Sequence, residues 1–583
     1  LKSYDVIVED CRDTIDFDFD LDREIGEAVA ELGEDAKLWR DGNNVIHVNL
    51  VEKLLVSMLA KMSNFVLGAG IWMNTQRPEW NDANNALVGN GVSMVTLCYL
   101  RRYMSFLLEL MKDVASMGHV ESSSAVADWF GDVAEVLANR RSLLGDAEVS
   151  DVQRRELLDE LGRAFGKYRE RVYNEGPVGS ATIDVTALCE FLTDAIAFSD
   201  HTIRLNQRED ALYHAYNLIE FADGEVRIQR LYEMLEGQVA VLSSGCLTSE
   251  EAADLLDSMF LSRMYRADQK TFMLYPEREL ADFVERNVIE EPQVTGNALL
   301  AELIAKGNER FVIKDSDGLY RFHADFEKRS DVESRLDELA ASPEFAPLVA
   351  SERDSVVELY ERVFGHHAYT GRSGTMYGYE GLGCIYWHMV SKLLLAVQEN
   401  YLAAVEADAG EPTLRLKELY YRVRAGLGPS KTPEEFGAFP MDAYSHTSSH
   451  SGARQPGMTG QVKEEVLTRF GELGIRVRDG IIQFRASLLL ANEFATKSTV
   501  LDYVDVEQKS QQVEVPEGSL AFTYCQVPVV YRATTDQNEK VVVTLKDGGT
   551  VECPDMQLDK TLSELILGRT GKVQSIEVCV RVG

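Results

Sequence analysis

The sequence predicts a mainly helical protein that ends in a small antiparallel β-domain, and two patterns support this fold class. From about residue 50 to residue 473, apolar residues recur every three to four positions in one segment after another. After residue 474 the period changes to two, and Asp-Gly turns separate short β-rich runs. Because no strands are expected to alternate with the helices, the pattern disfavours a doubly wound α/β sheet.

Length and charge narrow the class of protein. The chain has 583 residues, of which 45% are hydrophobic, and this suits a large globular protein of two or more domains. It has no run of eighteen apolar residues, so we expect no membrane span. Lys and Arg number 59 against 95 Asp and Glu, giving a net charge of −36. This charge disfavours nucleic acid as a partner and suits a neutral carbohydrate substrate.

The cysteines bear on the cellular compartment, and the first residue bears on whether the sequence is a piece of a longer protein. The chain begins at Leu1 without an initiator Met or a signal-peptide pattern, so we expect either a processed start or one piece of a longer protein. The eight cysteines are scattered without a C-x-x-C pair, which indicates buried thiols in a reducing, cytoplasmic compartment rather than disulfides or zinc ligands. They are Cys11, Cys98, Cys189, Cys246, Cys384, Cys525, Cys553 and Cys579.

Three domains are expected along the chain. Residues 1–30 form a linker or edge segment, because acidic and apolar residues alternate over residues 13–22. Residues 31–474 form the helical domain, as a solenoid or a closed ring of helical hairpins, and residues 475–583 form the β-domain. Besides a helix near 48–66, helices are expected at 92–116, 126–144, 150–173, 184–221, 226–242, 249–260, 296–306, 352–364, 385–406, 412–426 and 460–473.

A polar cluster at residues 77–85 precedes an apolar helix that is expected to start near Gly91 or Val92. In such a cluster Trp80 can stack on the C–H face of a sugar ring, while Asn81 and Asp82 bind its hydroxyl edge. Packing against an aromatic ring also raises the pKa of an aspartate and keeps it protonated as a general acid. Alternatively, Asp82 and the neighbouring asparagines cap the helix.

A Gly-rich stretch at residues 365–389 is the second candidate site. Its backbone N–H groups, with Thr370, Arg372 and a histidine at 366 or 367, can cradle an anion such as phosphate. It lacks the Walker lysine, so a nucleotide P-loop is excluded. The alternative is a tight turn whose tyrosines pack into the core.

The third candidate is the stretch 444–465, where His446 and His450 lie four residues apart. Its Ser and Gly content indicates a loop, so we expect no metal site. Five of the ten histidines lie between 366 and 450, and we therefore expect this loop and the Gly-rich stretch to face one cleft. The candidates for sugar contacts there are Tyr379, His446, His450, Arg454 and Gln455.

Two of these stretches resemble motifs of six-hairpin glycosidases of the cellobiose and chitobiose phosphorylase type. "EWNDANNALVGNGVS" is similar to the Gly-Asp-Trp-Asn-Asp-Gly-Met-Asn stretch of that family, whose second Asp is the general acid. The match implies this role for Asp82, with Glu79 in place of the first Asp. "YTGRSGTMY" is similar to the Thr-Gly-Ser-Ala-Gly-Trp-Met loop, whose Thr-Gly pair binds inorganic phosphate, and so indicates Thr370 and Gly371.

The resemblance implies an (α/α)6 helical toroid followed by the β-domain, with inorganic phosphate as co-substrate and no cofactor. Ala83, Asn84 and Thr375 depart from the motifs, so the identity of the sugar does not follow. In the family a β-sandwich and the first helices precede the acid, whereas only 81 residues precede Asp82. The resemblance therefore implies that a missing N-terminal portion, or another copy in a homo-oligomer, completes the cleft.

Three functions remain open on the sequence. In an inverting phosphorylase Asp82 protonates the glycosidic oxygen while phosphate, held by the histidines 366 and 367 and by Thr370, Gly371 and Arg372, attacks the opposite face. An inverting hydrolase needs a second carboxylate, roughly 6.5–9.5 Å from the acid, and Glu380 is the candidate base; Glu79 more plausibly binds a hydroxyl. A carbohydrate-binding scaffold would be favoured if Arg77 paired with Asp82.

Overall fold

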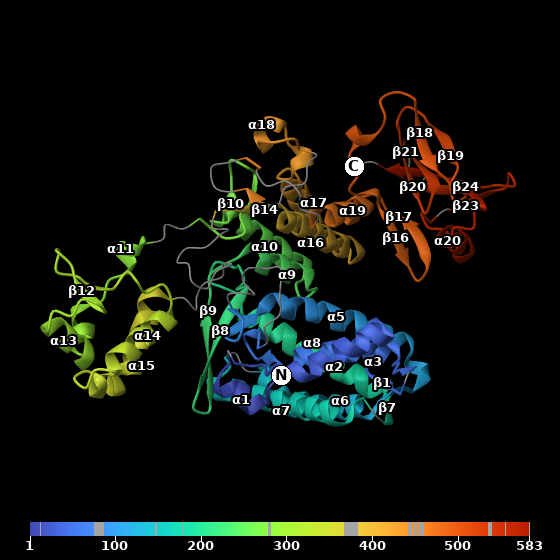
Figure 1. The fold of residues 1–583 in the computed structure, drawn as a ribbon. Helices are drawn as coiled ribbons and strands as arrows, with labels where there is room; N and C mark the ends of the chain where they lie inside the picture. Colours follow the sequence, from blue (N-terminus) through green and yellow to red (C-terminus); the bar gives the residue numbers. More distant parts are fainter. Residues whose placement is uncertain are drawn as a thin grey trace. The chain divides into compact units, whose positions relative to one another are not determined.

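The computed structural model divides the chain into two compact units (Figure 1), Leu1–Tyr386 with His446–Arg454, and Trp387–Ser445 with Gln455–Gly583. For residues 446, 447 and 460–462 only the backbone is described. The structure describes the chain apart from residues 12, 43, 75–86, 146–147, 178, 278–280, 366–382, 441–445, 448–451, 454–459, 535–538, 554 and 582–583.

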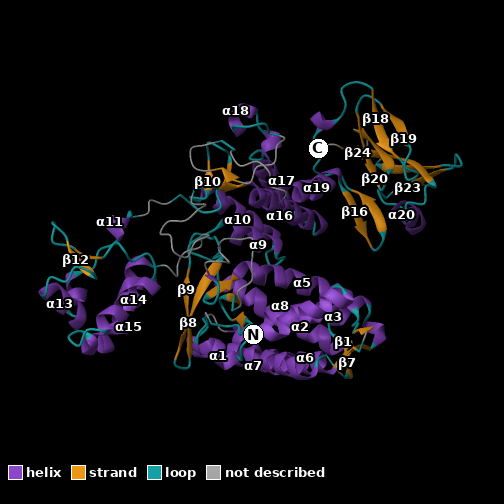
Figure 2. Cartoon of the chain, in the orientation of Figure 1, coloured by secondary structure: helices purple, strands orange, loops and turns teal. Residues whose placement is uncertain are grey.

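Helices make up most of the first unit (Figure 2). Helix α5 packs against α8 and α9, and α6 packs against α7. The expected helices are confirmed within a few residues at 92–116, 126–144, 150–173 and 249–260, and the capping box of Thr248 with Glu251 is present. The helices are α3 (Leu50–Met62), α5 (Met94–Asp113), α6 (Ser124–Asn139), α7 (Asp151–Glu175), α8 (Val185–Leu205), α9 (Leu235–Ser243) and α10 (Ser249–Leu261).

An antiparallel five-stranded sheet, in the order β3-β4-β5-β8-β9, also lies in this unit. Its strands are β3 (Phe65–Val66), β4 (Gly70–Trp72), β5 (Gly91–Ser93), β8 (Tyr216–Ala222) and β9 (Glu225–Arg230). The expectation of helix was therefore wrong for the end of 184–221 and for the beginning of 226–242. Asp223-Gly224 joins β8 to β9 as a tight turn, which is the same kind of Asp-Gly hairpin turn that the sequence predicts in the β-domain.

The N-terminal segment differs from its prediction. The alternating residues 13–22 were expected to be extended, but α2 (Phe19–Leu32) begins within them. The carboxylate of Asp18 accepts hydrogen bonds from the backbone N–H groups of Asp20 at 3.1 Å and Leu21 at 2.9 Å, which stabilises the helix start. Two further short elements flank it, α1 (Tyr4–Glu9) and the hairpin β1 (Arg40–Asp41) with β2 (Asn44–Val45).

A second hairpin of this unit pairs β6 (His119–Ser123) with β7 (Ser180–Asp184), and a third pairs β10 (Tyr265–Arg266) with β11 (Thr271–Phe272).

Residues 283–365 have a hydrophobic core of their own, which runs from Ile289 to Phe364. The two ends of this segment meet, because the Phe283 and Phe364 rings stack at 6.0 Å and Arg286 Nη2 donates to the Phe364 carbonyl at 3.4 Å. The segment is called the insertion here. It comprises α11 (Phe283–Arg286), α12 (Glu291–Thr295), α13 (Ala298–Ala305), β12 (Val312–Lys314), β13 (Tyr320–Phe322), α14 (Arg329–Ala340) and α15 (Ala346–Phe364).

The second unit combines helices with the C-terminal β-domain. Helix α16 (Trp387–Glu406) packs against α17 (Glu411–Arg424) and α19 (Gly460–Leu473), and the short α18 (Pro433–Phe436) lies between the last two in sequence. The hairpin β16 (Ile475–Arg478) with β17 (Ile481–Phe484) turns at Asp479-Gly480, as predicted.

The rest of the β-domain contains a five-stranded sheet in the order β20-β21-β24-β22-β23. The predicted Asp547-Gly548-Gly549 turn joins β22 to β23, and β21 pairs with β24 in parallel, an arrangement that was not expected. The elements are the hairpin β18 (Thr499–Val504) with β19 (Ser510–Val515), the sheet strands β20 (Ser519–Tyr524), β21 (Val527–Thr534), β22 (Lys540–Leu545), β23 (Thr550–Cys553) and β24 (Val573–Arg581), and helix α20 (Lys560–Leu567).

Within the described ranges, no helix has both the length and the apolar character needed to cross a membrane.

Candidate functional site

The polar cluster predicted to carry the acid lies between β4 and β5. Its site residues Arg77, Glu79, Trp80, Asn81 and Asp82 lie outside the described residues. The chain on either side of them is tightly paired: Gly89 N–H donates to the Met73 carbonyl at 2.7 Å, and Met73 N–H donates to the Gly91 carbonyl at 2.9 Å. The described residues on the two sides of segment 75–86 therefore lie next to each other.

A cavity of about 510 Å³ opens beside these paired ends. Its wall combines apolar side chains such as Trp72 with the amides of Asn64 and Asn74, which are hydrogen-bonded to each other at 2.6 Å. A mixture of apolar surface and a few fixed polar groups is typical of small-ligand sites. The described lining residues are Leu1, Val56, Ser57, Ala60, Lys61, Asn64, Ile71, Trp72, Met73, Asn74, Val88, Thr96 and Phe165.

Helix α5 follows this segment and bears on the alternative role of Asp82 as a helix cap. The helix begins at Met94, and its N-cap is Ser93, whose Oγ accepts a hydrogen bond from Thr96 N–H at 3.0 Å. Ser93 belongs to β5, so the residues at 91–93, where the sequence predicts the start of the helix, form a strand. The N-cap position of α5 is therefore Ser93, and Asp82 lies outside the described residues.

Glu236 is a buried carboxylate that the sequence analysis missed. It lies in the first turn of α9 and is 8% exposed, and its Oε2 accepts a hydrogen bond from the Tyr216 hydroxyl at 3.0 Å. Tyr216 in turn pairs with Ser93 across β8 and β5. The only signal in the sequence is one acidic residue in the apolar stretch "MLEGQVAVL".

The Gly-rich stretch falls mostly outside the described residues, and with it His366, His367, Thr370, Gly371, Arg372, Tyr379 and Glu380. The chain resumes as β14 (Ile385–Tyr386), which pairs antiparallel with β15 (His446–Thr447), so that Tyr386 lies opposite His446. The backbone at His446 is thus adjacent to the end of the Gly-rich stretch. His450, Arg454 and Gln455 also lie outside the described residues.

Hydrogen bonds connect the end of the Gly-rich stretch to the start of α9. Leu274 N–H donates to the Cys384 carbonyl at 2.8 Å, and Leu235 N–H donates to the Leu274 carbonyl at 2.9 Å. Leu235 immediately precedes Glu236. The β5–β8 pair approaches Glu236 through Tyr216, so the chain adjoining both predicted segments converges on the beginning of α9.

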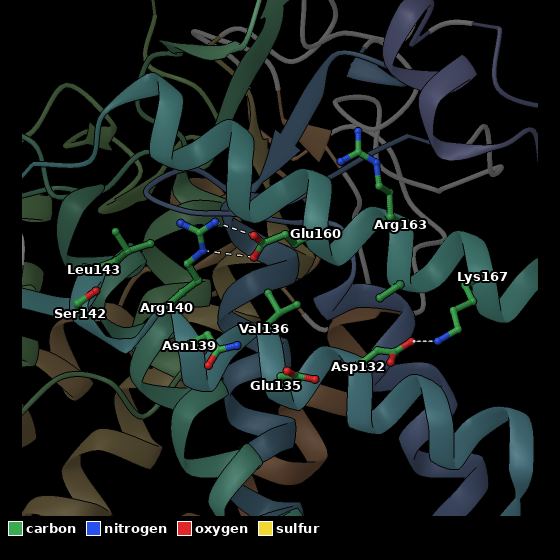
Figure 3. Close-up of a pocket in the computed structure, with 11 residues that line it drawn as sticks. Asp132, Glu135, Val136, Asn139, Arg140, Ser142, Leu143, Glu160, Arg163 and Lys167 are labelled. Atoms are coloured by element: carbon green, nitrogen blue, oxygen red, sulfur yellow. Dashed lines mark hydrogen bonds and ion pairs between the residues drawn. The ribbon is translucent and has the colours of Figure 1, made fainter.

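A second depression, of about 660 Å³, lies between α6 and α7 (Figure 3) and contains none of the predicted site residues. Four of its charged groups pair with each other, Arg140 with Glu160 at 2.6 Å and Lys167 with Asp132 at 2.8 Å. No aromatic side chain is among the described residues that line it, so it offers no stacking surface for a sugar ring. Across the described ranges, no group of three or more His, Cys, Asp or Glu is arranged to hold a metal ion.

His214 lies just before β8, and its protonation is expected to make the free energy of unfolding depend on pH. Its Nδ1–H donates to the Leu231 carbonyl at 2.6 Å. Burial, aided by the charges of Arg230 and Arg208 and opposed by this hydrogen bond and by Asp210, lowers the pKa of His214 below its ordinary value of 6.5. The unfolded chain therefore binds a proton more readily than the folded protein does.

We expect the free energy of unfolding to fall as the pH drops below 6.5, because stability from a depressed pKa is lost as the pH falls through the folded value. The contribution of His214 is at most about 1.4 kcal/mol per pH unit. His214→Asn, which keeps a donor for Leu231, should flatten the dependence in urea unfolding between about pH 5 and 8. The matched control is the exposed His119→Asn; an unchanged slope in His214→Asn would contradict the assignment.

Comparison with protein families adds one finding. Residues 280–367 match the model described as GH149 phosphorylase insertion domain 2, and this range coincides with the insertion and its separate core. The match ends directly before the "AYTGRSG" stretch, in which phosphate binding was predicted. No curated protein matches the chain. The insertion domain indicates that the chain is an enzyme, a glycoside phosphorylase.

Proposed function

We propose that this enzyme cleaves a β-linked di- or oligosaccharide by phosphorolysis with inversion, and that Asp82 is its general acid. The proposal is carried by the match over residues 280–367 together with the motif that begins at its border. The closely paired ends of segment 75–86 and the cavity beside them support it, because a general acid must be held within hydrogen-bonding reach of the oxygen that it protonates.

In the proposed reaction the carboxyl group of Asp82 donates a proton to the glycosidic oxygen as the C–O bond breaks. A phosphate oxygen attacks the anomeric carbon from the opposite face, so the products are a sugar 1-phosphate and a shortened saccharide. Phosphate itself is the nucleophile, and no second catalytic carboxylate is needed. Thr370 and Gly371 would hold the phosphate, with His366, His367 or Arg372 supplying charge.

The sugar would be oriented by stacking on Trp80 and by hydrogen bonds from its hydroxyls. Glu236 is suited to accept such hydrogen bonds, since it is buried, lies beside β5 through Tyr216 and adjoins the backbone link to Cys384. A buried carboxylate at this place would therefore select for a particular arrangement of hydroxyl groups.

The test compares the wild-type enzyme with Asp82→Asn on a panel of β-linked disaccharides and oligosaccharides, with and without inorganic phosphate. We expect α-configured sugar 1-phosphate only when phosphate is present, and a loss of about 10²–10⁴-fold in kcat for the variant. Thr370→Ala serves as a second variant and should raise the KM for phosphate.

Other products would overturn parts of the proposal. Free sugar released at the same rate without phosphate would indicate a hydrolase with Glu380 as base. A sugar phosphate that retains the β-configuration would exclude inversion. Full activity in Asp82→Asn would exclude Asp82 as the general acid.

A further inference from the structure

The turn between β3 and β4 is held by side chains from distant parts of the chain. Three consecutive carbonyl groups each accept a hydrogen bond there: Leu67 from Arg154 Nε at 2.9 Å, Gly68 from Asn206 Nδ2 at 3.1 Å, and Ala69 from Asn217 Nδ2 at 2.8 Å. Gly68 N–H donates to Thr202 Oγ1 at 3.1 Å. Arg154 lies in α7, Thr202 in α8 and Asn217 in β8, and Asn206 directly follows α8.

The same side chains are connected to each other. Asn217 Nδ2 also donates to Asn206 Oδ1 at 3.0 Å, and Arg230 at the end of β9 donates to Asn206 Oδ1 and, at 3.1 Å, to the Gly68 carbonyl. Thr202, Asn206 and Asn217 are each 0% exposed. These residues form a connected polar network inside the first unit, and we call it the turn network.

Burying a polar network costs free energy of desolvation unless its donors and acceptors find partners. Its advantage over apolar packing is that it permits only one arrangement of the backbone that it contacts. The pairing of β4 with β5 is short: it consists of the pairs Ile71–Ser93 and Trp72–Val92 and of two backbone hydrogen bonds that join Met73 to Gly89 and Gly91. So short a pairing gives limited control over register, and a slip of one residue would turn every side chain of β4 to the other face.

We propose that the turn network positions the general acid: it fixes β4 at its beginning, and β4 leads directly into segment 75–86. Thr202, Asn206, Asn217 and Arg230 are positioning residues in this sense, since none of them is placed at the substrate. The inference rests on the proposed role of Asp82. It predicts a specific catalytic defect, in which proton donation suffers while phosphate binding is preserved.

The test uses Thr202→Val, which removes the acceptor of Gly68 N–H with little change of shape, and Thr202→Ser, which keeps the hydroxyl. Each variant is assayed on a disaccharide and on the dinitrophenyl glycoside of the same donor sugar, whose leaving group needs no protonation. For Thr202→Val we expect kcat on the disaccharide to fall roughly tenfold to hundredfold, since small misplacements of catalytic groups have effects of this size. Activity on the aryl glycoside and the KM for phosphate should stay near the wild-type values, and Thr202→Ser should restore the disaccharide activity.

Equal losses on both substrates would overturn the inference, because they would show that the network serves stability alone. If Thr202→Val does not fold, Arg230→Met at the end of the outer strand β9 is judged by the same criterion. Asp82→Asn is measured in parallel to separate the two hypotheses. If that variant shows no dependence on the leaving group, the proposed function fails; if it does and the network variants do not, only the positioning role fails.

Discussion

Replacement of Gly70 by alanine is expected to lower the free energy of unfolding by at least about 3 kcal/mol. Gly70 has a φ of +127°, and an added Cβ would lie 2.7 Å from the carbonyl oxygen of Ser93. That oxygen belongs to the paired strand β5, and Ser93 also caps α5, so the neighbour has little freedom to move. Urea unfolding followed by circular dichroism measures the loss.

The matched control for this substitution is Gly131→Ala. Gly131 lies inside α6, and an added Cβ would meet no atom within 4 Å. Alanine in an open helical position should stabilise the protein by up to about 1 kcal/mol. If both variants changed stability by a similar amount, the close approach of β4 to β5 would not constrain Gly70.

The second large effect is expected from Glu236→Gln, which should lower kcat/KM on the saccharide roughly tenfold to hundredfold. The substitution keeps the shape and an acceptor for the Tyr216 hydroxyl, but it replaces one carboxyl oxygen of the group that we propose binds the sugar with an amide NH2. Loss of one hydrogen bond at a buried site, which leaves its partner unpaired, has an effect of this order. Initial rates over a range of saccharide concentrations give the value.

Glu220→Gln is the control for Glu236→Gln, because Glu220 is exposed on the same sheet, in β8. It should leave kcat/KM unchanged. The thermal unfolding midpoint of both variants should also be compared with that of the wild type. If Glu236→Gln lowered only the midpoint and kept the rate, Glu236 would be a structural residue and no sugar ligand.

The sequence predicted those parts of the fold that depend on neighbouring residues. Thr248 and Glu251 form the expected capping box, and Asp479-Gly480 forms the expected hairpin, because both signals act within a few positions. The strands β8 and β9 were missed although Asp223-Gly224 joins them in the same way. Their apolar residues adjoin long helical patterns, and β8 also pairs with the distant β5, a contact that the local sequence does not reveal.

In the candidate site, too, the sequence indicated the residues that belong to local motifs and missed those that depend on distant contacts. Motifs drew attention to Asp82 and Thr370, and both roles stay predictions because these residues lie outside the described part of the chain. Glu236 could not be singled out from the sequence, since its importance depends on Tyr216 and on the backbone that converges there. The turn network is equally invisible in the sequence: Asn206 and Gly68 are 138 positions apart.

The attachment of the insertion has a consequence for how such enzymes can diverge. Leu274 and Cys384 are hydrogen-bonded to each other on the near side of the insertion, and Arg286 bonds to Phe364 within it. The hydrogen bond between Leu274 and Cys384 therefore joins the two chain ends at the base of the insertion, whatever the length of chain between Leu274 and Cys384. Because doubling the length of a loop costs only about 0.6 kcal/mol, a whole domain can be gained, exchanged or lost here in a single genetic event, while the surrounding helices keep their sequence.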